Sequence, residues 1–344
     1  MSRIPLRNFS SSTRRCVEAA KSLIQAPRIR HIDALKENGV LGLYSPSGLD
    51  AVWYSKVESK VKDLEYGISI STQRSTLERC FVEETAPATS NVQFEFSGRQ
   101  TSISKFHAVL SETAKRADDS LVYQAAGSVY GAYYFVSSLV PNMRASATSV
   151  GKPDQSVLFE TPSLATQIDT MIPERLKHAI EDSFGSLVEF RTLLLQSAAA
   201  INGDGYSWLV SSVPDRSNGH GRSFDPLFIV NTYNSGVPDN VVRGGQVATL
   251  RKFTESRLED GVDNGFAAAP AFPTPAEAQE LLTSKNLAFK PLLSINASPS
   301  AFLPDYGVYG KGKYLDNVWD CIDWSVVESR LPVDFVSRER IQKK

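Results

Sequence analysis

Apolar residues recur at spacings of three and four in three parts of the chain, which predicts amphipathic helices. The first predicted helix runs from Leu49 to Leu64, with its lysines largely off the apolar stripe. A second helical stretch, Ser102 to Leu139, contains alanines and glycines that permit close helix packing. A third begins at Pro173, breaks at Gly185 and then resumes. The first two stretches, joined by a loop, predict an antiparallel helical hairpin.

Three short runs rich in β-branched and aromatic residues predict strands in the second half of the chain. They are Tyr206 to Ser211, Leu227 to Thr232 and Pro291 to Asn296. The last run leads into an elbow and then an aromatic helix with Trp319 and Trp324 along it. Helices alone, followed by helices mixed with strands, indicate an α+β fold.

Two segments between these elements carry little periodicity. Residues 66–99 are predicted to be a long loop or an insertion between helices, and residues 143–170 a linker. A third polar segment, 238–289, is predicted to be an insertion that is partly disordered, with a short helix from Pro275 to Ser284.

Composition limits the class of protein. At 344 residues with 42% hydrophobic residues, the chain is long enough for about two domains with buried cores. No apolar run reaches the roughly 18 residues that a membrane span needs, so none is expected. The three cysteines, Cys16, Cys80 and Cys321, are far apart and odd in number, which argues against a disulfide framework or a cysteine-based zinc site.

The net charge of −1 hides a strong asymmetry along the chain. Residues 1–30 contain seven of the 37 basic residues but only one of the 38 acidic residues. Arginine and serine with weak amphipathicity predict a mitochondrial transit peptide, and no apolar run there suits secretion. The alternative is a disordered basic tail that contacts anionic partners.

Four stretches resemble the iron/manganese superoxide dismutases, in the same order along the chain. They are SGLDAVWYSKVESKVKDLE from Ser47, Leu121 to Asn142, Pro173 to Val210, and Lys290 to Leu331. The third contains a Phe-Gly break and a Gly-x-Gly-aromatic-x-Trp-Leu-Val strand. The resemblance implies an N-terminal antiparallel helical hairpin, followed by a helical domain with a small three-stranded antiparallel sheet.

This resemblance divides the chain into expected parts. They are a transit peptide with a basic arm at 1–30, a helical hairpin domain with a loop insertion at 31–142, a linker at 143–170, a C-terminal dismutase-like domain at 171–335 with an insertion at 238–289, and a basic tail at 336–344.

The metal chemistry of that family needs three imidazoles and one carboxylate around Fe or Mn. The resemblance places the four ligand positions at Val52, Ala132, Asn296 and Ser300. None of these residues offers a strong donor, so no metal and no cofactor are expected. Nearby departures from the family pattern are Lys60 for an active-site Tyr, Ser298 for a Trp, Pro299 for the Glu that bridges subunits, and Ser128 for the Gln of iron enzymes.

Other chemistry finds little support in the sequence. The four histidines, His31, His107, His178 and His220, do not lie at ligand spacing. No glycine-rich phosphate loop and no nucleophile elbow occurs. The carboxylates of Asp305 and Asp316 are expected to serve as surface or helix-capping groups.

A dismutase fold without ligands and with a mitochondrial address resembles the dismutase-like proteins of fungal mitochondrial small ribosomal subunits. This implies a structural, non-enzymatic role in the matrix, with small-subunit proteins and rRNA as partners and a heterodimer with a second dismutase-like protein. Candidate RNA or partner contacts are Arg28, Arg30, Arg338, Arg340, Lys343 and Lys344. Two alternatives are an active mitochondrial Fe/Mn dismutase and a free pseudo-enzyme that dimerises with an active one.

Overall fold

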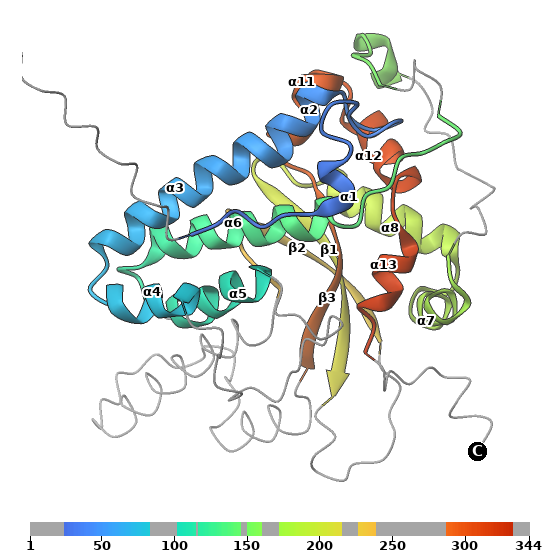
Figure 1. The fold of residues 1–344 in the computed structure, drawn as a ribbon. Coiled ribbons are helices and arrows are strands. Elements are labelled where there is room, and N and C mark those ends of the chain that lie inside the picture. The colour runs from blue at the N-terminus through green and yellow to red at the C-terminus, as the bar shows by residue number, and fades with distance from the viewer. Residues whose placement is uncertain are drawn as a thin grey trace, which may run out of the picture.

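Two long helices lie side by side along the N-terminal half of the protein, and a small sheet packs against them (Figure 1). The computed structural model describes residues 24–82, 102–114, 116–145, 150–159, 172–214, 226–238 and 287–332. Transit-peptide residues 1–23, the predicted helix from Pro275 to Ser284 and the basic tail 336–344 lie outside these ranges. The expected α+β fold with a three-stranded antiparallel sheet is confirmed.

The first long helix is more complex than the single helix predicted over Leu49 to Leu64. Three segments follow one another: the α-helix α2 (Pro46–Leu49), the π-helix η1 (Asp50–Tyr54) and the α-helix α3 (Ser55–Ile70). The short helix α1 (Arg30–Asp33) precedes them. Periodicity finds the apolar stripe but cannot show a π-turn, because the change affects only the backbone hydrogen bonds.

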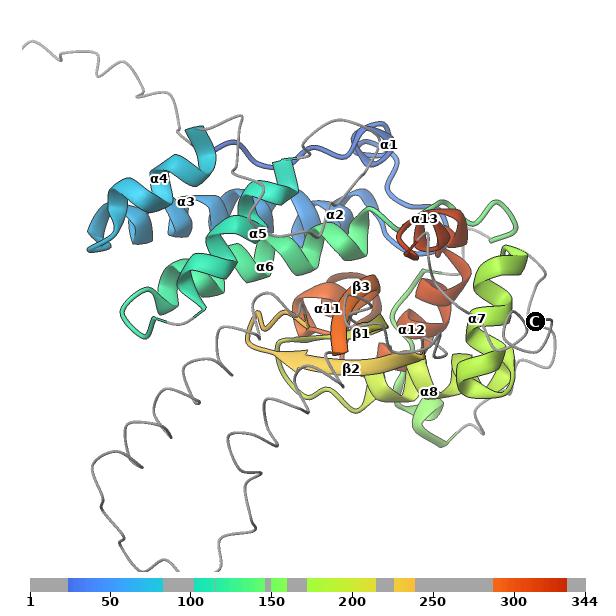
Figure 2. The ribbon, with the colours of Figure 1, turned by 90° about the horizontal axis from the view of Figure 1, so that it is seen from below.

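The second half of the hairpin corrects two predictions. Residues 74–82, assigned to a long loop, form helix α4 (Arg74–Val82). The stretch from Ser102 to Leu139 is two helices, α5 (Ser102–Thr113) and α6 (Ser120–Val136). Helix α6 packs along α3 and α5, as Figures 1 and 2 both show.

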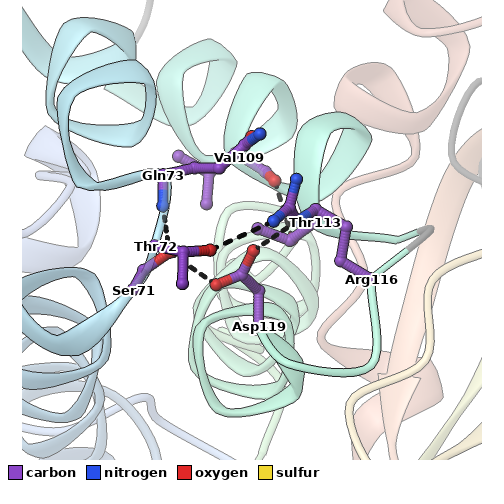
Figure 3. Close-up of polar contacts among 7 residues, drawn as sticks. All are labelled: Ser71, Thr72, Gln73, Val109, Thr113, Arg116 and Asp119. Atoms are coloured by element: carbon purple, nitrogen blue, oxygen red, sulfur yellow. Dashed lines mark hydrogen bonds and ion pairs between the residues drawn. The ribbon is translucent and has the colours of Figure 1, made fainter.

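Figure 3 shows the polar contacts at the tip of the hairpin, where the α3–α4 turn meets the connection before α6. Buried Asp119 accepts a hydrogen bond from Ser71 Oγ at 2.6 Å and pairs with Arg116 Nε at 2.8 Å. Arg116 also donates to Thr72 Oγ1 at 3.2 Å, and Ser71 Oγ accepts from the Gln73 amide. These contacts explain why the chain turns twice here instead of continuing in longer helices.

The predicted linker 143–170 contains the short 3-10 helix η2 (Gln155–Phe159), and helices α7 (Glu174–Phe184) and α8 (Leu187–Ala199) follow it. Gly185, at φ +90°, ends α7 as predicted. The Ser186 hydroxyl then caps α8 by accepting from the Glu189 amide at 3.1 Å. The break therefore comes from a left-handed glycine followed by a serine N-cap.

The sheet has strand order β2-β1-β3, all antiparallel, with bounds β1 (Gly205–Pro214), β2 (Leu227–Tyr233) and β3 (Leu287–Asn296). Strand β1 is buried on both faces. On one face Trp208 packs against the tyrosines of α6, and on the other the α8 hydroxyl of Ser197 donates to Asn231 of β2 at 2.8 Å. A register shift between Leu209 and Val210 accommodates the pairing of β1 with β3.

The predicted elbow contains a helix, α11 (Pro299–Tyr306), and the predicted aromatic helix is two short helices, α12 (Lys311–Asp320) and α13 (Trp324–Ser329). Asp323 ends the run because its carboxylate caps α13, accepting from the Ser325 amide at 3.0 Å. Trp319 and Trp324 therefore belong to different helices, yet their ring centroids are 4.9 Å apart. Among the described residues, no helix is long and apolar enough to cross a bilayer.

A candidate site around the former ligand positions

The four positions that the resemblance assigns to metal ligands, which we call the former ligand positions, occupy elements that pack together around the end of β3. Helix α6 packs on η1 and on β3, and α11 packs on η1. Val52, Ala132 and Asn296 are fully buried, whereas Ser300 is exposed in the first turn of α11. Alkyl side chains, one neutral amide and one solvent-facing hydroxyl do not form a donor set for Fe or Mn. Within the described ranges, no group of three or more His, Cys, Asp or Glu residues could hold a metal ion.

Close packing replaces coordination beside Ala132. A Cβ built at Gly131 would lie 3.0 Å from the ring of Tyr206, so the strand aromatic lies directly against the helix backbone. The buried Ser294 hydroxyl donates to the Gly131 carbonyl at 3.2 Å, which ties β3 to α6. Little space for a side chain is therefore left on this side of the former site.

Asn296 is the most polar of the four positions, and only some of its hydrogen-bonding groups have partners. Its Oδ1 accepts from the Ser298 amide at 3.1 Å, and its backbone carbonyl accepts from the Tyr314 hydroxyl at 2.7 Å. Its Nδ2 has no hydrogen-bond partner among the described residues. A buried amide donor without a partner costs free energy, about 1–3 kcal/mol.

Three tyrosines, Tyr44, Tyr306 and Tyr314, have hydrogen-bonded hydroxyls and form what we call the tyrosine cluster. Tyr44 donates to Tyr314 at 3.0 Å, and Tyr306 donates to the Leu43 carbonyl at 2.7 Å. Asn317 Nδ2 donates to the Tyr306 hydroxyl at 2.9 Å. Burial raises the pKa of each of these phenols, so they remain neutral donors near neutral pH.

Asp305 has the capping role that the sequence favoured. Its carboxylate accepts from the Ser45 amide at 2.8 Å and from the Ser45 hydroxyl at 2.6 Å, at the start of α2. A Cβ at Gly48 would lie 2.0 Å from the same carboxylate. The contact therefore joins α11 to α2 and requires glycine at position 48. Asp316, the other carboxylate considered, pairs with Arg191 Nη2 at 2.6 Å across α8 and α12.

A cavity of about 700 Å³ opens beside the former ligand positions, and we call it the lysine cavity. Its lining includes Lys56 and Lys60 of α3, Ser128 of α6, Asp204 before β1, and Ser298 and Ser300 at the start of α11. Burial lowers the pKa of Lys56, but the Tyr206 hydroxyl and the charge of Asp204 raise that pKa by more. Lys56 is therefore protonated at neutral pH.

Sequence reasoning noted Lys60, Ser128 and Ser298 only as departures from a family pattern and did not foresee the cavity. Lys56 and Lys60, four residues apart off the apolar stripe, were a weak indication because they share a helix face. The opposite wall includes Asn234 and Ser235, at φ 50° and φ 65°. Asparagine is enriched in this conformation, but nothing in the sequence indicated it for Ser235.

The histidines do not converge in the described structure. His31 of α1 is exposed, and desolvation lowers its pKa although Asp323 opposes the shift. His107 of α5 packs its ring 6.1 Å from that of Tyr130, and His178 of α7 lies 3.6 Å from Glu174. His220 lies outside the described residues.

The proposed contact residues fall into two groups. Arg28 and Arg30 are exposed at the start of the described chain. Arg338, Arg340, Lys343 and Lys344 lie beyond its last described residue.

Comparison with known proteins gives one family match and two relatives. Residues 172–236 match the family of iron/manganese superoxide dismutases, C-terminal domain. The chain is 21% identical over 297 residues to small ribosomal subunit protein mS43 of Schizosaccharomyces pombe, which covers 86% of this chain and 82% of that protein. It is 30% identical over 156 residues to small ribosomal subunit protein mS42 of the same organism, which covers 45% of this chain and half of that protein.

Proposed function

We propose that this chain, a relative of small ribosomal subunit proteins with a C-terminal domain of the iron/manganese superoxide dismutase type, is a structural component of the mitochondrial small ribosomal subunit. The observation that carries the proposal is the similarity to mS43, because it extends over most of both chains and is not confined to the dismutase domain. The composition of the N-terminal 30 residues supports the mitochondrial address.

The donor set supports a non-enzymatic role. A redox metal in this fold would need imidazole and carboxylate ligands, and the chain offers Val52, Ala132, Asn296 and Ser300 instead. The packing of Gly131 against Tyr206 and the satisfied tyrosine cluster support a fold that persists through side-chain packing. The protein then acts as a scaffold that supports mitochondrial translation.

Metal analysis and a dismutase assay on the purified protein test the scaffold against the enzyme. We expect no stoichiometric Fe or Mn after expression in medium supplemented with either metal, and no activity above that of heat-denatured protein. About one metal ion per chain together with activity would overturn the proposal in favour of a dismutase. A free pseudo-enzyme would lack metal but would be recovered in complex with an active dismutase.

The same proposal includes a heterodimer with a second dismutase-like subunit protein. Charge supports protein contacts over a broad RNA face, because the chain beyond residue 30 is acidic. Affinity purification of the tagged chain from salt-washed subunits, followed by mass spectrometry, should recover one dismutase-like partner in equal amount. Recovery of a homodimer would contradict this part of the proposal.

Three further assignments remain proposals of the same kind. N-terminal sequencing of the mature protein should place the cleavage within residues 1–30. Limited proteolysis should cut first in two segments. One is the linker 143–170, between the proposed domains 31–142 and 171–335, and the other is the insertion 238–289, within the second domain. Crosslinking to rRNA should map to exposed Arg28 and Arg30, or to the tail residues from Arg338 to Lys344.

A further inference from the structure

The lysine cavity has an excess of positive charge near its walls. Lys56 Nζ lies 3.4 Å from the Tyr206 hydroxyl and 5.7 Å from the centroid of that ring. No carboxylate of the described chain lies within ion-pair distance of Lys56. Asp204, the acidic residue of the lining, instead accepts from the Ser298 hydroxyl at 2.5 Å. A partly buried ammonium without a close counter-charge favours an anion in the adjoining space.

The second ammonium, that of Lys60, is held only weakly by its ion pair. Lys60 Nζ pairs with Asp63 at 2.7 Å, but the side chains are 38% and 41% exposed. Exposed pairs of this kind contribute little and exchange readily for other partners. Lys60 can therefore turn toward an anion that enters beside Lys56.

Neutral polar groups surround the two lysines. Hydroxyls come from Ser128, Ser235, Ser298 and Ser300, and amides come from Gln124 and Asn234. The start of α11 adds the positive end of a helix dipole, and no side chain caps that start.

One wall is held in a strained conformation by close packing. The left-handed Asn234 and Ser235 turn lies against α6, where a Cβ at Gly127 would come within 2.2 Å of the Ser235 carbonyl oxygen. Such strain persists only where surrounding structure determines it, and it is concentrated at binding sites. The cavity wall is therefore set before any ligand arrives.

We propose that the lysine cavity binds a ribose phosphate group. The phosphate would pair with Lys56 and Lys60, as in lysine-based phosphate sites, and would accept from the serine hydroxyls of the lining other than that of Ser298, which already donates to Asp204. The sugar hydroxyls would donate to Asp204 and to the amide oxygens of the wall. A cavity of about 700 Å³ is of the size that binds small molecules.

A carboxylate side chain of a protein partner fits the same cavity less well. It has two acceptor oxygens and no hydroxyl groups, so it would bring no donor to Asp204 Oδ2 or to the amide oxygens, whereas Asp204 Oδ1 already accepts from Ser298. The ribose phosphate can belong to a free ribonucleotide or to a strand of RNA. The inference rests on the cavity alone, and its failure would leave the proposed role in the small subunit standing.

The test titrates the purified full-length chain with adenosine monophosphate, with adenosine, and with a hexamer of oligoadenylate, using calorimetry. Lys56→Gln should weaken binding of the phosphate-bearing probes by roughly tenfold or more, as expected for loss of a charge-assisted hydrogen bond. Lys60→Gln should weaken it less. Lys62→Gln is the matched control, because Lys62 is 70% exposed on the same helix and pairs with Glu58. That variant should bind as the parent does.

Reductive methylation read by mass spectrometry gives a second readout that does not depend on variants folding. Either phosphate-bearing probe should protect Lys56 but not Lys62, and adenosine should protect neither. Protection by the hexamer alone would assign the ligand to an RNA strand, and protection by the mononucleotide to a free nucleotide. The proposal is overturned if neither probe protects Lys56, if the Lys56 and Lys62 variants lose affinity equally, or if only an aspartate-rich peptide protects Lys56.

Discussion

Asn296 lies between two regions of the molecule that differ in how their polar groups are satisfied. On one side are the former ligand positions, where Val52 and Ala132 are alkyl groups and the Asn296 Nδ2 has no hydrogen-bond partner in the described structure. On the other side is the tyrosine cluster, which is joined to β3 by the hydrogen bond that the Tyr314 hydroxyl donates to the Asn296 carbonyl. A metal centre would require the reverse arrangement, with the strongest polar contacts at the ligand positions.

This difference in hydrogen bonding indicates which of the two regions contributes more to the free energy of unfolding. In the tyrosine cluster each hydroxyl has a partner, and the Tyr306 and Tyr314 rings also pack edge to face, with their centroids 5.5 Å apart. The ligand positions contribute mainly by filling space. We therefore expect substitutions in the cluster to cost more than substitutions at the ligand positions.

The largest effect should come from Tyr314→Ala. Removing this fully buried ring deletes two hydrogen bonds and leaves a cavity, so we expect a loss of about 3–5 kcal/mol in the free energy of unfolding. Val52→Ala is the matched comparison and should cost about 2 kcal/mol. Denaturant unfolding of both variants measures the difference. A larger loss for Val52→Ala would reverse the comparison.

Asn296→Asp returns a carboxylate to one ligand position. An ionised carboxylate buried there without a close cation should destabilise the protein by about 3 kcal/mol at neutral pH. Burial raises the folded-state pKa of such a group, so the loss should shrink as pH falls toward the unfolded-state pKa. Adding Mn²⁺ should not restore stability, because positions 52 and 132 offer no donors. Rescue by Mn²⁺ would show that the site can still be completed.

Alkaline pH should lower the stability that the tyrosine cluster contributes, and this is the next largest expected effect. Because the folded-state pKa of each cluster phenol is raised above its unfolded value, the stability it contributes is complete below pH 10 and is lost as pH rises. Cys321, whose pKa burial raises to about 12, acts in the same direction from about pH 9. Unfolding free energies at pH 8, 10 and 11 measure the decline. Tyr314→Phe should show a shallower decline, and an equal one would remove the cluster as its cause.

The smallest effect should follow Ser300→Ala. This former ligand position is exposed, and the start of α11 does not depend on its side chain, so the change should lie within about 0.5 kcal/mol. Thermal unfolding provides the measurement. A loss above 1 kcal/mol would mean that the hydroxyl has a structural partner that the comparison overlooks.

Sequence patterns predicted the elements whose burial is periodic or continuous. The stripe that includes Val57, Val61 and Leu64 located the first long helix, and Gly185 located the break before α8. Helix α4 was missed because, over residues 74–81, only Leu77 and Phe81 are buried, one turn apart. Strand β3 begins at Leu287, before its predicted start at Pro291. Pairing with β1, not the residue pattern of β3 itself, extends the strand.

The candidate site could be predicted only where it depends on residue identity. The loss of donors at positions 52, 132, 296 and 300 follows from side-chain chemistry, whatever the packing. The lysine cavity depends on five segments that are far apart in the chain and together form its lining. The left-handed turn at Asn234 and Ser235 packs its Ser235 carbonyl against Gly127, a contact that the local sequence does not indicate.

Sedimentation of a mitochondrial lysate at high salt tests the central claim most directly, with the chain followed by mass spectrometry across the gradient. High salt screens loose electrostatic association, so only proteins held in the assembly should stay with it. The account predicts that the chain migrates with the small ribosomal subunit and is depleted from the top of the gradient. A chain found only in the free fractions would contradict it.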